Sequence, residues 1–157
     1  MAEGIEIERK FLVDGLPPTM RLARREPIRQ GYLALDGDTE VRVRLTPKRA
    51  VLTVKGGRGE VRTEEEVVLD KRQADALWEL TDGRRVQKTR RRVRVGDAIA
   101  EVDEYFGDLD GLVVAEVEFD DEGASRSFQA PSWFVREVTG DPRYSNRNLA
   151  SDGIPAD

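Results

Sequence analysis

Hydrophobic and charged side chains alternate with a period of two along most of the chain. Between residues 41 and 45, for example, three aliphatic side chains alternate with Arg42 and Arg44. Successive side chains of a β-strand point to opposite faces of its sheet, so this period predicts strands with one apolar face and one charged face. About eight such strands are predicted, at residues 5–13, 30–35, 41–45, 51–55, 61–69, 86–95, 99–106 and 115–119.

Short glycine-containing segments separate most of the predicted strands. Gly37-Asp38, Gly96-Asp97 and Asp110-Gly111 supply residues that tolerate a positive φ angle, as hairpin turns require. Hairpins join antiparallel strands, and the sheet is therefore predicted to be mainly antiparallel. Segment 56–59 is also predicted to be a hairpin turn. It is not a phosphate-binding P-loop, because Lys55 precedes the glycines instead of following them.

Helical signals are fewer than strand signals. Asp70 is suited to cap a helix through Leu80, with Gln73 at the reciprocal position of a capping box. Further helices are predicted at residues 121–129, 131–138 and 142–150. The last two begin with proline, which suits a first helical turn. The chain is thus predicted to be one α+β domain over residues 1–157, mainly antiparallel β, and ordered at about 4–150.

The sequence of 157 residues contains neither cysteine nor histidine. Disulfides, zinc-thiolate sites, iron–sulfur clusters and cysteine nucleophiles are therefore excluded, and so are a Ser-His-Asp triad and histidine-bound metals. Any acid–base chemistry is left to lysine, tyrosine, carboxylates or metal-bound water.

The net charge of −5 argues against a dedicated nucleic-acid-binding protein. No apolar run approaches the roughly 18 residues of a membrane span, and the N-terminal residues lack the apolar core of a signal peptide. The sequence therefore predicts a cytoplasmic protein with no membrane or nucleic-acid partner.

The charged residues of the predicted strands are sorted by sign. Acidic pairs two residues apart stand at Glu6/Glu8, Glu64/Glu66, Glu101/Asp103 and Glu116/Glu118, and basic pairs at Arg42/Arg44, Lys88/Arg90 and Arg92/Arg94. An antiparallel sheet often exposes one charged face to water, and for any single strand this is the simpler explanation. Like charges on one face repel each other, however, so a merely solvated face would mix the two signs along a strand.

A ligand that needs both sets of charges is a metal-bound polyanion. Carboxylates without histidine or cysteine favour hard cations such as Mg²⁺ or Mn²⁺, and arginine and lysine favour phosphate groups. A triphosphate that carries a divalent cation combines the two. All charged faces reach one such ligand when the sheet closes, or nearly closes, into a barrel with a polar lumen. We expect that arrangement, with helices over part of the outside.

The segment Glu6-Ile7-Glu8-Arg9-Lys10 carries the ExExK signature of the CYTH family, also called triphosphate tunnel metalloenzymes, which this sequence resembles. The resemblance continues in order through Arg29-Gln30-Gly31-Tyr32-Leu33, Val41-Arg42-Val43-Arg44, Thr53-Val54-Lys55, Glu64-Glu65-Glu66, Lys88-Thr89-Arg90, Val102-Asp103, Glu116-Val117-Glu118-Phe119 and Asp141-Pro142-Arg143-Tyr144-Ser145-Asn146. It is strongest to the short bacterial inorganic tripolyphosphatases. The resemblance implies an eight-stranded antiparallel β-tunnel with a charged lumen and flanking helices.

The resemblance also implies a role for each charged position. The residues expected to bind the substrate phosphates are Arg42, Arg44, Lys55, Lys88 and Arg90. The residues expected to bind divalent metal ions are Glu6, Glu8, Asp103, Glu116 and Glu118. Other side chains expected in the lumen are Glu64, Glu66, Arg62, Arg92, Glu101 and Arg143. The C-terminal helix, with Arg143, Tyr144 and Asn146, is expected either to line one tunnel mouth or simply to pack against the sheet.

The predicted function is metal-dependent hydrolysis of the terminal phosphoanhydride of inorganic tripolyphosphate. Lys10 and Tyr32 are implied near the attacked phosphorus, one orienting or deprotonating the water and the other holding it. A carboxylate or a metal-bound hydroxide is the alternative base. The sequence leaves open a thiamine or nucleoside triphosphatase, an adenylate cyclase on the same tunnel, and a non-catalytic polyphosphate- or nucleotide-binding module. It also leaves open the assembly state, a homodimer included.

Overall fold

The computed structural model describes residues 7–57 and 62–156, and within them nine strands form a single antiparallel sheet. The strands are β1 (Ile7–Val13), β2 (Arg25–Asp36), β3 (Thr39–Leu45), β4 (Ala50–Gly56), β5 (Thr63–Leu69), β6 (Arg85–Val95), β7 (Ala98–Tyr105), β8 (Val113–Phe119) and β9 (Phe134–Glu137). Their order across the sheet is β5-β4-β3-β2-β6-β7-β8-β1-β9. The predicted fold class, mainly antiparallel β with flanking helices, is confirmed.

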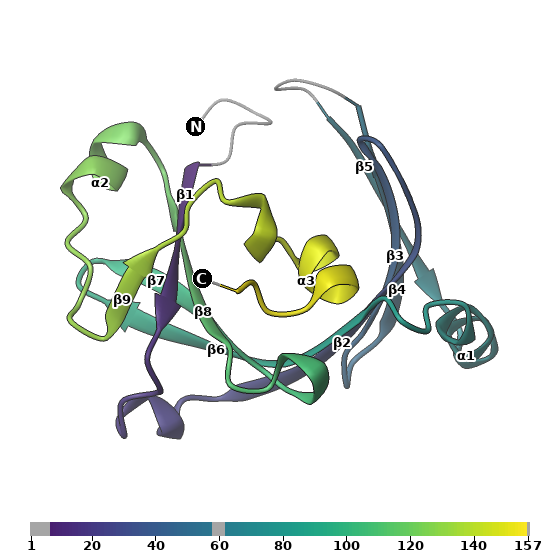
Figure 1. Cartoon of the computed structure of the whole chain (residues 1–157), viewed down its shortest axis with the longest axis horizontal. Helices are drawn as coiled ribbons and strands as arrows, with labels where there is room; N and C mark the ends of the chain where they lie inside the picture. The colour runs from purple at the N-terminus through teal and green to yellow at the C-terminus, as the bar shows by residue number, and fades with distance from the viewer. Residues whose placement is uncertain (1–6, 58–61, 157) are drawn as a thin grey trace.

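The sheet curves into an open C and does not close into a barrel (Figure 1). Its edge strands, β5 and β9, each pair with a single neighbour within the described residues. The expected tunnel-like sheet is therefore confirmed in its nearly closed form, with nine strands in the described residues where about eight were predicted. Glu64, Glu65 and Glu66 stand exposed on β5, and charged side chains on an edge strand oppose pairing with another strand.

The additional strand comes from the segment predicted as the helix 131–138. β9 pairs antiparallel with β1, so that Val13 lies opposite Phe134. Phe134 is buried, and its ring centroid lies 4.8 Å from that of Phe11. The helix prediction was wrong because Pro131 is as compatible with the turn before a strand as with a helix start. The choice is made by a partner strand more than a hundred residues away in sequence.

The described residues form three α-helices and three short 3-10 turns. The α-helices are α1 (Lys71–Glu79), α2 (Glu122–Ser127) and α3 (Asn146–Asp152), and the 3-10 turns are η1 (Met20–Leu22), η2 (Gly107–Leu109) and η3 (Pro142–Tyr144). The predicted capping box of α1 is confirmed. The Asp70 carboxylate accepts from the Gln73 backbone N–H at 2.8 Å, and the Asp70 N–H donates to the Gln73 side chain at 2.9 Å. Within the described part of the chain, no helix has the length and apolar character needed to cross a membrane.

The apolar side chains of the strands pack on the convex face. At one end of the sheet, Phe11 and Val117 are buried beside the partly buried Phe128, which follows α2. At the other end, Val43 and Leu69 are buried where α1 covers β3, β4 and β5. Figure 1 shows both helices on the outside of the C. The alternation therefore turns most apolar side chains of the strands outward and places most of the charged ones on the concave face.

The C-terminal segment lies inside the curve of the sheet (Figure 1). Tyr144 of η3 and Leu149 of α3 are buried in a cluster with Val86, Tyr105 and Val114. The concave face thus has an apolar floor that the C-terminal segment covers, and the rest of that face carries the charged side chains. The C-terminal helix thus packs against the sheet, and lining one tunnel mouth, the other role considered for it, stays a prediction.

Candidate active site

Arg42 and Arg44 lie on the concave face of β3, as the alternation predicts, while Val43 between them is buried on the convex side. The strand register places Tyr32 of β2 opposite Arg42, and Gln30 opposite Arg44. The two arginines line a hollow of about 380 Å³ between β2 and β5. One half of the concave face is therefore basic and open to a ligand.

Side-chain hydrogen bonds connect the residues of the basic half. Arg44 Nε donates to Gln30 Oε1 at 2.8 Å, and Gln30 Nε2 donates to the Tyr32 hydroxyl at 2.7 Å. Burial lowers the pKa of Arg44, and the charges of Arg42 and Arg90 lower it further. Arg42 Nε is buried without a hydrogen-bond partner among the described residues. These positive groups repel one another, and a bound anion would relieve that repulsion.

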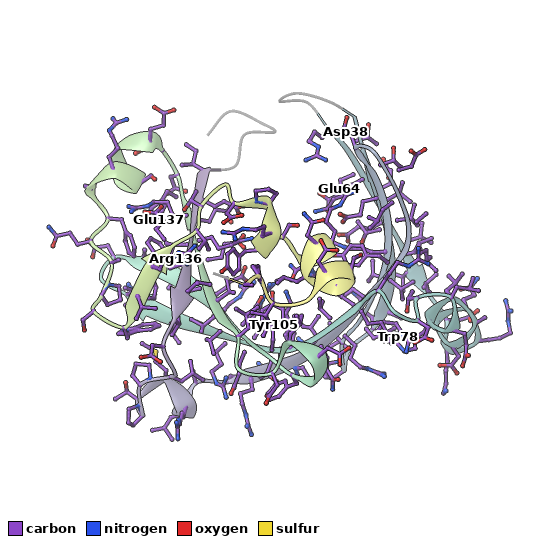
Figure 2. The ribbon with its side chains drawn as sticks, viewed as in Figure 1. Asp38, Glu64, Trp78, Tyr105, Arg136 and Glu137 are labelled. Atoms are coloured by element: carbon purple, nitrogen blue, oxygen red, sulfur yellow. The ribbon has the colours of Figure 1, made fainter. Side chains whose placement is uncertain are left out.

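Lys88, Arg90 and Asp103 form the centre of the concave face. Lys88 Nζ lies 2.8 Å from Asp103 Oδ2, and Arg90 contacts both Asp103 oxygens, at 2.8 and 3.0 Å. The Tyr105 hydroxyl donates to Asn146 Oδ1 at 2.6 Å, and Lys88 Nζ donates to the same oxygen at 3.5 Å. Tyr105 lies on the concave side beneath the C-terminal segment (Figure 2). The first residue of α3 is therefore tied directly to a predicted phosphate-binding lysine.

Asp103 is buried between two basic side chains. Burial raises the pKa of Asp103, but the charges of Lys88 and Arg90 and their hydrogen bonds outweigh burial and lower it. Both carboxylate oxygens are occupied by these cations. The strand register, which sets Arg90 directly opposite Asp103, brings these groups together. The role of Asp103 as a metal ligand stays a prediction.

Burial lowers the pKa of Lys88 to about 8 from an ordinary 10.5, although the Asp103 carboxylate opposes the shift. Between these two values the unfolded chain binds more protons at this lysine than the folded chain, so the free energy of unfolding rises with pH there. The destabilisation by the buried charge is full below about pH 8 and is lost toward pH 10.5.

We expect the native protein to gain stability relative to Lys88→Met between about pH 7 and about pH 10. Urea denaturation of both proteins at the two pH values tests this, because all other titrating groups cancel in the difference. A stability difference that is the same at both pH values contradicts the lowered pKa of Lys88.

The other half of the concave face is acidic. The register places Glu8 of β1 opposite Glu118 of β8, and Glu101 of β7 opposite Glu116 of β8. Like charges directly opposite each other destabilise a strand pair. Glu101 is compensated by Arg92, whose largely exposed side chain lies 3.0 Å away. Glu116 and Glu118 make no ion pair with any described residue.

The chemistry of these carboxylates fits a hard divalent cation, because they offer oxygen atoms alone. Glu101, Glu116 and Glu118 line one side of a hollow of about 1020 Å³ that continues around the ends of β6, β7 and β8. Across residues 7–57 and 62–156, no three acidic side chains are gathered closely enough to hold a metal ion. Glu6, a further predicted ligand, lies outside the described residues.

The predicted pair of Lys10 and Tyr32 shares the concave face but is not in contact. Lys10 lies opposite Glu116, and its Nζ donates to the backbone oxygen of Tyr144 at 3.3 Å. Tyr32 lies on β2, and β6, β7 and β8 separate β2 from β1. The structure therefore places Lys10 on the acidic half of the face and Tyr32 on the basic half.

The remaining predicted residues lie toward the open side. Lys55 of β4 stands opposite Glu64 of β5, and Glu64 lies on the inner side of β5 (Figure 2). Glu66 is exposed on the same strand, and Arg62 is exposed just before it. Arg143 is half exposed in η3 and pairs with a carboxylate of its own turn at 2.7 Å. These side chains lie around the cluster of Lys88, Arg90 and Asp103 at the centre of the concave face.

Two polar residues at the centre carried no predicted role. Gln30 links Arg44 to Tyr32, and Tyr105 links the sheet to Asn146. The signal that could have found them is positional. Gln30 stands two residues before Tyr32, and Tyr105 two residues after Asp103, so strand alternation places each on the charged face.

The CYTH domain profile matches residues 4–152, nearly the whole chain. The chain belongs to the CYTH family. The resemblance inferred from the ordered strand motifs is thereby confirmed.

Similar proteins agree in size and in fold. An inorganic triphosphatase of Nitrosomonas europaea is 43% identical over 147 residues, which cover 92% of this chain and 96% of the relative. An inorganic triphosphatase of Acetivibrio thermocellus is 42% identical over 151 residues, covering 95% of each protein. A crystal structure of an inorganic triphosphatase matches with a TM-score of 0.80 and 41% identity, covering 96% of this chain and 100% of that one. A conserved hypothetical protein from Pyrococcus furiosus, at 18% identity and a TM-score of 0.52, covers 78% of this chain and 85% of its own, and it shares the fold.

Proposed function

We propose that this CYTH protein hydrolyses the terminal phosphoanhydride bond of inorganic tripolyphosphate in the presence of Mg²⁺ or Mn²⁺. The observation that carries the proposal is the division of one concave face into a basic half and an acidic half. The basic half is built on β2, β3 and β6, and the acidic half on β1, β7 and β8. The two relatives named inorganic triphosphatase, each more than 40% identical, support the same activity.

The basic residues are suited to bind a chain of phosphates. Arg42, Arg44, Lys88 and Arg90 present positive charge from β3 and β6, the two strands that flank β2, and Lys55 of β4 adds another toward the open side. Arginine binds non-bridging phosphate oxygens through two parallel hydrogen bonds, which gives orientation as well as affinity. Burial and, after it, repulsion by Arg42 and Arg90 lower the pKa of Arg44, and a bound triphosphate would offset that repulsion.

Glu8, Glu116 and Glu118 would hold the divalent cation, with Glu6 as the further ligand that the family motif implies. A cation bound there would neutralise negative charge on the phosphate oxygens. Without it, these carboxylates would face the phosphates of the substrate and repel them.

Hydrolysis requires one water molecule placed in line with the terminal phosphorus. Its oxygen forms a new bond to phosphorus while the bond to the bridging oxygen breaks, and orthophosphate and pyrophosphate leave. The water must also lose a proton. Burial raises the pKa of Tyr32 to about 12, with the Glu40 charge adding to the shift, so Tyr32 keeps its proton and donates a hydrogen bond. Lys10 is then the proposed proton acceptor.

The concave face favours an inorganic substrate over an organic one. A nucleobase or a thiamine ring is usually held by stacking on an aromatic side chain. The aromatic residues of the concave face, Tyr32, Tyr105 and Tyr144, are each no more than 3% exposed and offer no free ring face. We therefore expect ATP and thiamine triphosphate to be hydrolysed more slowly than tripolyphosphate.

Phosphate release from tripolyphosphate, ATP, thiamine triphosphate and pyrophosphate, each with Mg²⁺ and with Mn²⁺, tests the proposal. We expect tripolyphosphate to be hydrolysed fastest, and only with a divalent cation. Faster turnover of ATP or thiamine triphosphate would make this an organic triphosphatase. Formation of cyclic AMP would make it a cyclase, and binding without phosphate release would make it a binding module.

Arg42→Ala and Arg44→Ala are expected to lower kcat/KM for tripolyphosphate by roughly tenfold to a hundredfold each, because each removes a charge-assisted hydrogen bond. Both variants should fold, and thermal melts should show equal or higher stability without substrate, since each relieves crowding of positive charge. Arg126→Ala, an exposed arginine of α2, is the control. Unchanged kinetics would remove these arginines from the substrate site.

A further inference from the structure

Gln30 is a fully buried polar side chain between two residues of the proposed site. It is 0% exposed on β2, where it faces Arg44 of β3 and Val86 of β6 across the two strand pairs. Its amide accepts from Arg44 Nε at 2.8 Å and donates to the Tyr32 hydroxyl at 2.7 Å. One side chain therefore contacts a proposed phosphate-binding arginine and the proposed hydrogen-bond donor at the same time.

The Gln30 amide has one permitted orientation. A guanidinium group carries hydrogen-bond donors and no acceptor, so the amide oxygen must face Arg44 and the amide NH₂ must face Tyr32. The Tyr32 oxygen consequently accepts this hydrogen bond, and its own proton is left for another partner. Among the described residues, the Tyr32 hydroxyl donates to no protein acceptor.

The same contact orients Arg44. Gln30 uses only the Nε–H of the guanidinium, and the two Nη groups make no hydrogen bond to any residue in the described ranges. Arg44 lines the hollow of about 380 Å³ beside Arg42. Because Nε is hydrogen-bonded to Gln30, the two Nη groups are the part of Arg44 available to a ligand in that hollow.

We propose that Gln30 is a positioning residue for triphosphate hydrolysis, which turns the Tyr32 hydroxyl proton and the Nη groups of Arg44 toward the substrate. This inference rests on the proposed function. If Gln30 merely fills space and satisfies two buried groups, its replacement lowers stability without a selective effect on turnover.

Gln30→Glu tests the proposal because it keeps the shape and replaces the amide donor with a carboxylate oxygen. The Tyr32 hydroxyl must then donate to the introduced carboxylate, which withdraws its proton from the substrate. We expect kcat to fall roughly tenfold to a hundredfold in the native background. In a Tyr32→Phe background the same substitution should leave kcat nearly unchanged, because the hydroxyl on which it acts is absent.

The KM for tripolyphosphate reports the effect of Gln30→Glu on Arg44 separately from its effect on Tyr32. The introduced carboxylate neutralises the Arg44 charge, so KM for tripolyphosphate should rise in both backgrounds. Gln87→Glu is the matched control, since Gln87 is an exposed glutamine on the opposite face of the neighbouring strand β6. It should change neither kcat nor KM.

A second measurement reports on the hydrogen bond itself. The chain contains three tyrosines, and with tyrosine labelled by ¹³C at Cζ the Tyr32 resonance is assigned by its loss in Tyr32→Phe. Gln30→Glu should shift this resonance and leave those of Tyr105 and Tyr144 in place. Should Gln30→Glu fail to fold, Gln30→Met, which is similar in shape and forms neither hydrogen bond, takes its place in both measurements.

An equal loss of kcat in the native and Tyr32→Phe backgrounds overturns the proposal, and so does a Tyr32 resonance that does not move. A wild-type protein without activity on any triphosphate contradicts the proposed function instead, and with it the catalytic part of this inference. In that case a shifted Tyr32 resonance still supports the contact between Gln30 and the Tyr32 hydroxyl, so the two failures are distinguishable.

Discussion

Glu116→Ala is expected to remove metal-dependent phosphate release from tripolyphosphate, with a loss on the order of a hundredfold to a thousandfold. Glu116 lies on the concave face opposite Glu101 and Lys10, and it has no ion pair among the described residues. Its carboxylate is therefore free to bind a cation. Without it, the remaining carboxylates face the substrate phosphates with less neutralising charge.

Phosphate release over a Mg²⁺ titration, and in excess EDTA, measures this effect. Glu118→Ala should behave like Glu116→Ala, and Glu79→Ala, at the exposed end of α1, should keep full activity. Full activity of the wild type in EDTA would contradict the proposal, as would normal turnover of either concave-face variant at low millimolar Mg²⁺.

Glu116→Ala should lower the activity but raise the stability of the metal-free protein. Glu101 and Glu116 are directly opposite like charges, so Glu116→Ala should raise the melting temperature of the metal-free protein. Added Mg²⁺ should then stabilise the wild type more than the variant, because a ligand that binds the folded state more tightly stabilises it more. Thermal melts with and without Mg²⁺ therefore show whether Glu116→Ala loses activity because a metal ligand is missing or because the protein is misfolded.

Lys10→Ala is expected to lower kcat by on the order of a hundredfold to ten-thousandfold, the usual contribution of a positioned proton acceptor. Lys10 is a basic side chain on the acidic half of the concave face, and its Nζ lies 3.3 Å from the Tyr144 carbonyl. Since the pKa of Tyr32 is raised to about 12, Tyr32→Phe should cost less, because it removes a hydrogen-bond donor and no base.

A pH–rate profile of the wild type and both variants tests this assignment. The wild-type rate should rise toward alkaline pH as the proton acceptor loses its proton, and Lys10→Ala should lose this rise. Lys71→Ala, at an exposed lysine of α1, is the control. A Lys10→Ala protein with a higher KM, an unchanged kcat and an unmoved alkaline limb would show that Lys10 only binds phosphate and that another group accepts the proton.

The sequence by itself determined which face each side chain occupies. A period of two is a local property of extended backbone, and it places Arg42, Arg44, Glu116 and Glu118 on one side of their strands whatever the partners are. The capping box at Asp70 is equally local, since its hydrogen bonds span three residues. The family motifs follow the same strands, and the sequence alone therefore indicates the CYTH family.

Only the tertiary structure decided which strands meet and which charges face each other. Phe134–Glu137 forms a strand and not part of a helix because β1 offers it a partner, and the sheet stays open because β5 and β9 do not pair. Asp103 is a partner of Lys88 and Arg90 because the β6–β7 register brings them together, and Gln30 meets Arg44 through the β2–β3 register. Strand register and sheet closure depend on residues far apart in sequence, and local alternation carries no information about either.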